Sequence, residues 1–223
     1  DLSKNKIFSL GDASEIGTSV FDNLQEIENR LNANHTNDWA NMLPEERGSI
    51  LTSISNDLEN EPYELIYYLM HEAGKTIQNA IDEIREAIDF LRYYSKEIID
   101  LTKKDNTLEG PTGEINVLSY SSKGHFLCIS PWNFPVAILI GQISAALACG
   151  NRVTIKPSEH TSILGYLIVQ KFHKHGVPID ALELILGDGI YGDMLSKIKT
   201  VKGVAFTGSL KTAKKIQTNL NNN

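Results

Sequence analysis

The residue with the clearest potential for chemistry is Asn133, which lies in a turn with the sequence Ser-Pro-Trp-Asn-Phe-Pro over residues 130–135. Two prolines restrict φ and bias the residues before them away from the helical region, so we expect this turn to be stiff. An amide held in a stiff, apolar turn can donate a hydrogen bond to a developing oxyanion. For this residue taken alone, a buried amide that only ties the loop to backbone is the better interpretation.

A second candidate is the segment Lys156-Pro157-Ser158-Glu159, which places a cation and a carboxylate three residues apart. Both groups suit the hydroxyls of a ribose, and a carboxylate there would repel a 2′-phosphate, which favours NAD over NADP. The alternative interpretation is an exposed ion pair, which contributes only about 0–1 kcal/mol.

Residues 187–192 read Gly-Asp-Gly-Ile-Tyr-Gly, a literal match to the dinucleotide-binding fingerprint. The fingerprint should carry an acid about 20 residues later for the ribose. Phe206-Thr207-Gly208-Ser209 occupies that position instead. The glycines, Gly189 among them, therefore indicate either a close approach of backbone to a cofactor or a plain turn, with equal weight.

Thr207, Gly208 and Ser209 precede a predicted helix. The free N–H groups and the dipole at the start of a helix attract a pyrophosphate. The alternative is ordinary N-capping by Ser209 or Thr207.

From residue 125 onward the chain alternates short apolar strands with amphipathic or apolar helices. The predicted strands are 126–129, 152–155, 182–186 and 203–206, and the predicted helices are 136–148, 162–175, 194–199 and 211–220. Four consecutive strand-then-helix units predict a largely parallel, doubly wound sheet. Such sheets bind ligands at the carboxyl ends of their strands. All the candidate residues named above fall at those ends.

The first hundred residues carry apolar residues at helical spacing and predict helices, including one from residue 20 to 31 and a long one from 76 to 101. Alternation over residues 114–120 favours a short β excursion. We therefore predict an α/β chain in three parts: a helical region over 1–110, a β excursion or turn over 111–124, and a partial, doubly wound, Rossmann-like NAD-binding domain over 125–223.

Charge and composition exclude several functions. The 28 acidic and 21 basic side chains give a net charge of −7, so no electrostatic footprint for nucleic acid is present. No apolar run is long enough for a transmembrane segment. The start at Asp1 lacks a signal-like leader, which fits a cytoplasmic protein or an internal piece of a longer one. Cys128 and Cys149 have no metal-ligand spacing, so we expect two buried free thiols and no metal site.

Four motifs in this order resemble the amino-terminal part of the aldehyde dehydrogenase superfamily: Ser-Pro-Trp-Asn-Phe-Pro, Ala-Leu-Ala-Cys-Gly-Asn (146–151), Lys-Pro-Ser-Glu and Phe-Thr-Gly-Ser. Within the superfamily, segments 71–76, 85–94 and 128–130 are most similar to the L-glutamate γ-semialdehyde (pyrroline-5-carboxylate) dehydrogenase domains of bacterial proline utilisation A. The resemblance covers roughly residues 23–220.

The resemblance implies an NAD-dependent oxidation of a small aldehyde, L-glutamate γ-semialdehyde, to L-glutamate in proline catabolism. Asn133 would donate to the oxyanion of a cysteine thiohemiacetal. The implied cofactor contacts are Lys156 and Glu159 on the adenosine ribose, Gly208 and Ser209 with the following helix on the pyrophosphate, Gly189 and Phe206 on the adenine side, and Ser130 and Trp132 beside the nicotinamide half.

One departure from the superfamily concerns the nucleophile. The family's catalytic cysteine and general-base glutamate lie beyond the Phe-Thr-Gly-Ser motif, and neither Cys128 nor Cys149 matches the nucleophile. We therefore expect a chain truncated before the catalytic domain, inactive alone and self-associating, from a homo-oligomeric parent. Two alternatives stay open: a dehydrogenase of another semialdehyde, and a non-catalytic nucleotide-fold module for binding or assembly.

Overall fold

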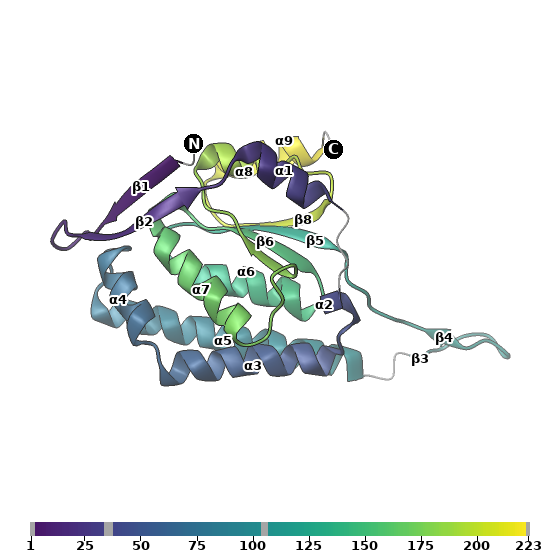
Figure 1. Cartoon of the computed structure of the whole chain (residues 1–223). Coiled ribbons are helices and arrows are strands. Elements are labelled where there is room, and N and C mark those ends of the chain that lie inside the picture. The colour runs from purple at the N-terminus through teal and green to yellow at the C-terminus, as the bar shows by residue number, and fades with distance from the viewer. Residues whose placement is uncertain (1–2, 34–37, 104–106, 222–223) are drawn as a thin grey trace.

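The computed structural model describes residues 3–33, 38–103 and 107–221 (Figure 1). Its strands are β1 (Ser3–Phe8), β2 (Glu15–Phe21), β3 (Thr107–Leu108), β4 (Asn116–Val117), β5 (His125–Ile129), β6 (Arg152–Lys156), β7 (Leu182–Leu184) and β8 (Val201–Phe206). Its helices are α1 (Leu24–Asn32), α2 (Asp38–Asn41), α3 (Pro44–Asn60), α4 (Tyr63–His71), α5 (Ile77–Lys103), α6 (Ala137–Ala148), a 3₁₀ turn at Glu159–Thr161, α7 (Ser162–Lys174), α8 (Gly189–Leu195) and α9 (Leu210–Asn221).

The central sheet has four strands in the order β7-β6-β5-β8, and every neighbouring pair is parallel. Strand alternation divides β5 between two cores: Phe126 and Cys128 contact the core formed with α3 to α7, whereas Leu127 and Ile129 contact the core that includes residues of α1, α8 and α9. Figure 1 shows α6 and α7 on one side of the sheet and α1, α8 and α9 on the other. The predicted doubly wound α/β fold is confirmed.

Helix α6 is buried on nearly all sides, as its almost wholly apolar sequence requires. The long helices α3 and α5 form a further layer beneath it (Figure 1). Gly141 brings α6 close to α5, because an added Cβ there would lie 3.2 Å from the ring of Phe90.

The prediction that the first hundred residues are helical was wrong at the amino terminus. Strands β1 and β2 form an antiparallel hairpin in which Ser3 pairs with Phe21 and Ile7 with Gly17. Strand β2 also contacts α7. Helix α1 begins only at Leu24, where the Asn23 side chain caps the first turn. The polar residues of β1 have no strict alternation, so the hairpin had no clear signal in the sequence.

The β excursion predicted over 114–120 is present but shorter. Only Asn116 and Val117 are in a strand, and they pair with Thr107 and Leu108 to form an arm that projects from the body of the molecule (Figure 1). Strand β3 therefore lies inside the region predicted to be helical. The division of the chain at residues 110 and 124 stays a prediction.

The helix predicted over 194–199 was also wrong, because α8 runs from Gly189 to Leu195. The Asp188 side chain accepts a hydrogen bond from the backbone N–H of Ile190 at 2.8 Å and begins the helix inside the glycine segment. The apolar residues Leu195 and Ile198 belong to the core that also holds Leu127 and Ile129 of β5. The other predicted elements of residues 125–223 agree with the structure to within two residues at each end.

Candidate functional site

A cleft of about 270 Å³ lies at the carboxyl edge of the sheet, between the ends of β5, β6 and β8 and the helices α8 and α9. From β5 the chain adds β6 and then β7 on one side of the sheet, and it then returns to form β8 on the other side of β5. The cleft therefore lies where the strand order reverses, which is where such folds bind ligands. All eight residues expected to contact a cofactor line it: Ser130, Trp132, Lys156, Glu159, Gly189, Phe206, Gly208 and Ser209.

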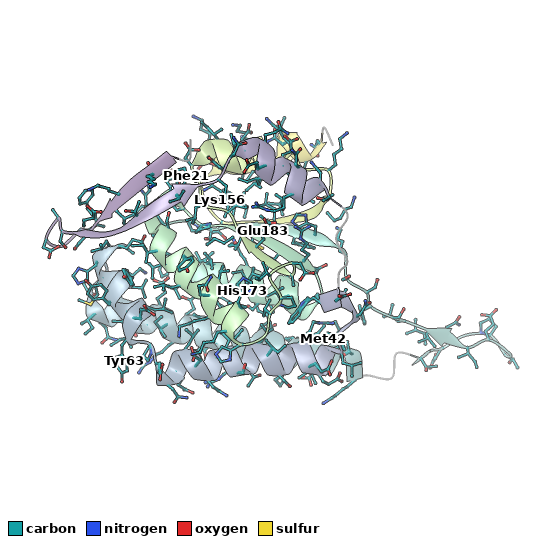
Figure 2. The ribbon with its side chains drawn as sticks, in the orientation of Figure 1. Phe21, Met42, Tyr63, Lys156, His173 and Glu183 are labelled. Atoms are coloured by element: carbon teal, nitrogen blue, oxygen red, sulfur yellow. The ribbon has the colours of Figure 1, made fainter. Side chains whose placement is uncertain are left out.

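Lys156 is the last residue of β6 and is only 5% exposed. Its ammonium donates to the carbonyl oxygen of Pro157 at 3.0 Å and lies 3.9 Å from the Glu159 carboxylate. Burial lowers the pKa of Lys156, and the charges of Glu159 and Asp188 oppose this shift. The alternative of an exposed ion pair is therefore wrong for the lysine. In Figure 2, Lys156 lies well apart from Tyr63 of α4 and Met42.

Ser130 supplies a buried hydroxyl at the end of β5. Its backbone N–H donates to the carbonyl of Lys156 at 3.3 Å, which holds the two strand ends together. Among the described residues its Oγ has no hydrogen-bond partner although it is buried. A buried hydroxyl without a partner costs free energy, which a polar ligand in the cleft would recover.

Two glycines shape the cleft, one by leaving open space beside its backbone and one by making room for an aromatic ring. An added Cβ at Gly189 would meet no atom within 4 Å, so the backbone there is open to a ligand. At Gly208 an added Cβ would lie 2.6 Å from the ring of Phe206. Any larger residue at 208 would displace that ring from the cleft wall.

Ser209 directly precedes α9, and its hydroxyl accepts a hydrogen bond from the backbone N–H of Thr212 at 3.2 Å. It therefore acts as an N-cap, which was the alternative to pyrophosphate binding that the sequence left open. The first turn of the helix still faces the cleft, with Thr212 in its lining. Capping and anion binding at a helix start are compatible, because a single side chain satisfies only one of the free N–H groups.

Sequence reasoning missed five further polar residues that line the cleft: Asp193, Ser196, Thr212, Lys215 and Asn219. Asp193 accepts from Asn219 at 2.9 Å and pairs with Lys215 at 3.0 Å. Hydrogen bonds from Lys197, Asn219 and Lys215 hold the pKa of Asp193 well below its usual range. The helical spacing of residues 212, 215 and 219 after the Thr-Gly-Ser motif could have indicated this face of α9.

Asn133 lies in the same turn as Ser130 but outside the cleft lining. The residue is exposed, and within the described residues no hydrogen bond to its amide is formed. The interpretation of a buried amide that ties the loop to backbone is therefore wrong. The amide is accessible at the surface of the turn.

The two cysteines differ in exposure. Cys128 is buried in β5, and burial raises the pKa of its thiol to about 12. Cys149 is exposed, so its predicted burial was wrong. Partial desolvation of its thiol by neighbouring atoms still raises its pKa, although the nearby cation of Arg47, which sequence reasoning did not find, opposes the shift. Neither thiol has the depressed pKa of a catalytic nucleophile.

The residues of the cleft fit a dinucleotide. A buried ammonium, an adjacent carboxylate, an unsatisfied buried hydroxyl, a helix start and an unhindered glycine backbone match the needs of ribose and pyrophosphate. Elsewhere in the described part of the chain, no group of three or more His, Cys, Asp or Glu side chains could hold a metal ion. No helix among the described residues is both long enough and apolar enough to cross a membrane.

The model of the aldehyde dehydrogenase family matches residues 22–223. This chain therefore belongs to the aldehyde dehydrogenase family.

Relatives with 35–41% identity include two kinds of protein. The chain is 41% identical over 183 residues to the bifunctional protein PutA of Salmonella typhimurium, an alignment that covers 82% of this chain and 13% of that protein. It is 36% identical over 172 residues to 1-pyrroline-5-carboxylate dehydrogenase 1 of Halalkalibacterium halodurans, covering 77% of this chain and 33% of that protein. The chain thus spans a third or less of the length of these relatives.

Solved structures share the fold. Proline utilization A from Bdellovibrio bacteriovorus superposes with a TM-score of 0.91 at 27% identity, covering 97% of this chain and 23% of that one. An NAD-dependent benzaldehyde dehydrogenase from Corynebacterium glutamicum superposes with a TM-score of 0.85 at 26% identity, covering 99% and 49%.

Proposed function

We propose that this chain forms the NAD-binding part of a dehydrogenase that oxidises L-glutamate γ-semialdehyde to L-glutamate in proline catabolism. The observation that carries the proposal is that all eight residues expected to contact NAD line one cleft at the carboxyl edge of the sheet. The similarity to PutA and to 1-pyrroline-5-carboxylate dehydrogenases supports the substrate.

In this proposal Lys156 and Glu159 hold the adenosine ribose, and the first turn of α9 with Gly208 and Ser209 meets the pyrophosphate. Gly189 and Phe206 form the adenine side, and Ser130 and Trp132 border the nicotinamide half. NAD, when bound, accepts the hydride of the oxidation. The protein groups bind and orient it, and the carboxylate of Glu159 disfavours a 2′-phosphate.

Asn133 is the proposed oxyanion donor. A donor of this kind contributes about 2.7–4 kcal/mol of transition-state stabilisation. The thiohemiacetal needs a thiolate nucleophile, and neither Cys128 nor Cys149 meets the electrostatic requirement for one. We therefore expect the 223 residues alone to bind NAD weakly and to turn over no aldehyde. Two free thiols fit a reducing compartment such as the cytoplasm.

Calorimetric titration of the chain with NAD and with NADP tests the proposal. We expect binding of NAD in preference to NADP, and we expect Glu159→Gln to reduce that preference by roughly fivefold, because removing one charge near a phosphate changes the interaction by about 1 kcal/mol. Glu64→Gln, a change of an exposed carboxylate on α4, is the matched control. Equal affinity for the two nucleotides in the wild-type chain would contradict the assignment of Glu159.

A substrate panel tests the reaction itself. The longest natural protein that contains these residues should oxidise L-glutamate γ-semialdehyde with a higher kcat/KM than other semialdehydes. Preference for another aldehyde would reject the substrate and leave the NAD site in place. Absence of NAD binding in both the chain and the longer protein would favour a non-catalytic module.

A further inference from the structure

The carboxylate of Glu83 is buried beneath the turn that carries Asn133. Glu83 lies in α5 and its side chain is fully buried. One oxygen, Oε1, accepts hydrogen bonds from the backbone N–H groups of Val136 at 2.7 Å and Ala137 at 3.1 Å. Those two residues lie where the turn ends and α6 begins, so the carboxylate caps the positive end of that helix from another element.

The other oxygen of Glu83 forms an ion pair with the ammonium of Lys75. Lys75 follows Gly74, whose φ of +67° is a left-handed conformation that turns the chain after α4. The Lys75 side chain is only 11% exposed. A lone buried carboxylate would be costly, and the lysine removes that cost.

The same ammonium lies 4.0 Å from the centroid of the Phe134 ring. Phe134 follows Asn133 directly in the turn, so one cation connects the buried carboxylate to the residue beside the amide. A cation over an aromatic face is attracted to the negative face of the ring. The turn is thus held at Phe134 by Lys75 and at Val136 by Glu83.

We propose that Lys75 and Glu83 are positioning residues, which set the conformation of the turn and so aim the amide of Asn133. The inference rests on the proposed function only in giving Asn133 a reacting role. None of Lys75, Glu83 and Phe134 lines the cleft proposed for NAD. Loss of the network should therefore displace the turn, including Trp132, while cleft residues outside the turn, such as Lys156 and Glu159, stay in place.

The two tryptophans of the chain allow a direct test. Trp132 lies in the turn and is 58% exposed, whereas Trp39 is buried and donates to the carbonyl of Leu147 near the opposite end of α6. In the chain labelled with ¹⁵N-tryptophan, the indole N–H of Trp132 reports the turn and that of Trp39 reports the core. Trp132→Phe assigns the two signals.

We expect Lys75→Met to shift or broaden the Trp132 signal several times more than Lys96→Met, the matched control. Lys96 lies on α5 in an exposed i,i+4 pair with Asp100 at 3.0 Å. Lys75→Arg keeps the cation and should restore the Trp132 signal. A Trp132 signal in Lys75→Met that moves no more than in the control would overturn the proposal.

The double variant Lys75→Met/Glu83→Gln separates positioning from stability. The glutamine oxygen can still accept from the two N–H groups, and no unpaired charge is left buried, so thermal stability should recover even if Lys75→Met alone folds poorly. The Trp132 signal should stay displaced, since the cation over Phe134 is still missing. Recovery of that signal together with stability would reject positioning.

Titration of the same variants with NAD keeps the two proposals apart. Lys75→Met and the double variant should still bind NAD, because Lys156, Glu159 and Ser209 lie outside the turn. Absence of NAD binding in the wild-type chain would count against the proposed function, whereas the Trp132 signals would still decide the positioning role.

Discussion

The guanidinium of Arg47 donates through Nε to the carbonyl oxygen of Ala148 at 2.9 Å, which joins α3 to the last residue of α6. A further nitrogen, Nη1, donates to the carbonyl oxygens of Trp39 and Met42. Since Glu83 binds the N-terminal end of α6, a buried anion lies at the positive end of this helix and a buried cation at its negative end. Each charge interacts favourably with the helix dipole at its end, and each satisfies backbone groups that water cannot reach.

Arg47→Met should lower the free energy of unfolding by about 2–4 kcal/mol, because it leaves buried carbonyls without donors while keeping most of the side-chain volume. Burial lowers the pKa of Arg47, because the enclosed guanidinium is removed from water. Urea unfolding at pH 7 measures the loss. Arg85→Met, an exposed change on α5, is the control and should stay within about 0.5 kcal/mol of the wild type.

Glu72 is predicted to make the stability of the chain depend on pH. Its two oxygens accept from the backbone N–H groups of Ile163 and Leu164 at 2.8 and 2.9 Å, and burial raises its pKa from 4.5 to about 7. The folded chain then keeps a proton that the unfolded chain releases, so the free energy of unfolding should fall by about 1–3 kcal/mol as pH rises from about 4.5 to 7.

Glu72→Gln cannot titrate and should lack this fall. In urea unfolding at pH 5 and pH 8, the free energy of unfolding of the variant should rise relative to that of the wild type at the higher pH. Glu64→Gln on the exposed face of α4 should keep the same difference from the wild type at both values. A constant difference for Glu72→Gln would mean that the carboxyl titrates normally in the folded chain.

Asp57 on α3 should stabilise the chain in the opposite pH range. It pairs with Lys171 at 2.6 Å and Lys174 at 3.0 Å, both on α7. Desolvation alone would raise its pKa, but hydrogen bonds from the two lysines outweigh it and bring the pKa down to about 2. Because the pKa of Asp57 is lower in the folded chain than in the unfolded chain, its carboxylate contributes to the free energy of unfolding above about pH 4. This contribution is lost as pH falls from about 4 to 2.

Asp57→Asn should therefore cost about 1–2 kcal/mol at pH 7 and much less at pH 2, as measured by thermal or urea unfolding across this range. Glu59→Gln affects only an exposed pair with Arg92 and should change stability little. An Asp57→Asn deficit that persists at pH 2 would show that packing, and not charge, is responsible.

Lys156→Met should separate binding from stability. Loss of a charged donor in the cleft should weaken NAD binding by roughly 10–100-fold. Because burial lowers the pKa of this lysine, its removal relieves a desolvation cost, and the melting temperature should stay equal or rise. Lys199→Met, an exposed change, should affect neither quantity. Unchanged NAD affinity in Lys156→Met would place the cofactor elsewhere.

Much of the candidate site could be predicted because its residues sit at the ends of strands that have a local signature. The apolar runs before Ser130, Lys156 and Thr207 mark buried strands, and parallel strands bring their carboxyl ends to one edge. The position of α8 could not be predicted from periodicity, because a side-chain cap at Asp188 begins a short helix within a glycine segment.

The sequence by itself determined the parallel sheet and the set of residues at its carboxyl edge, since both follow from alternation and motif order along the chain. Only the tertiary structure decided that the polar β1–β2 hairpin forms, that Cys149 is exposed beside Arg47, and that Lys75 and Glu83 hold the turn of Asn133. The hairpin joins neighbouring segments that lack an alternating pattern, whereas the contacts of Arg47 with Cys149, and of Lys75 and Glu83 with the turn, join residues that lie far apart in the chain. Local periodicity carries no record of which distant charge a helix end or a buried carboxylate will meet.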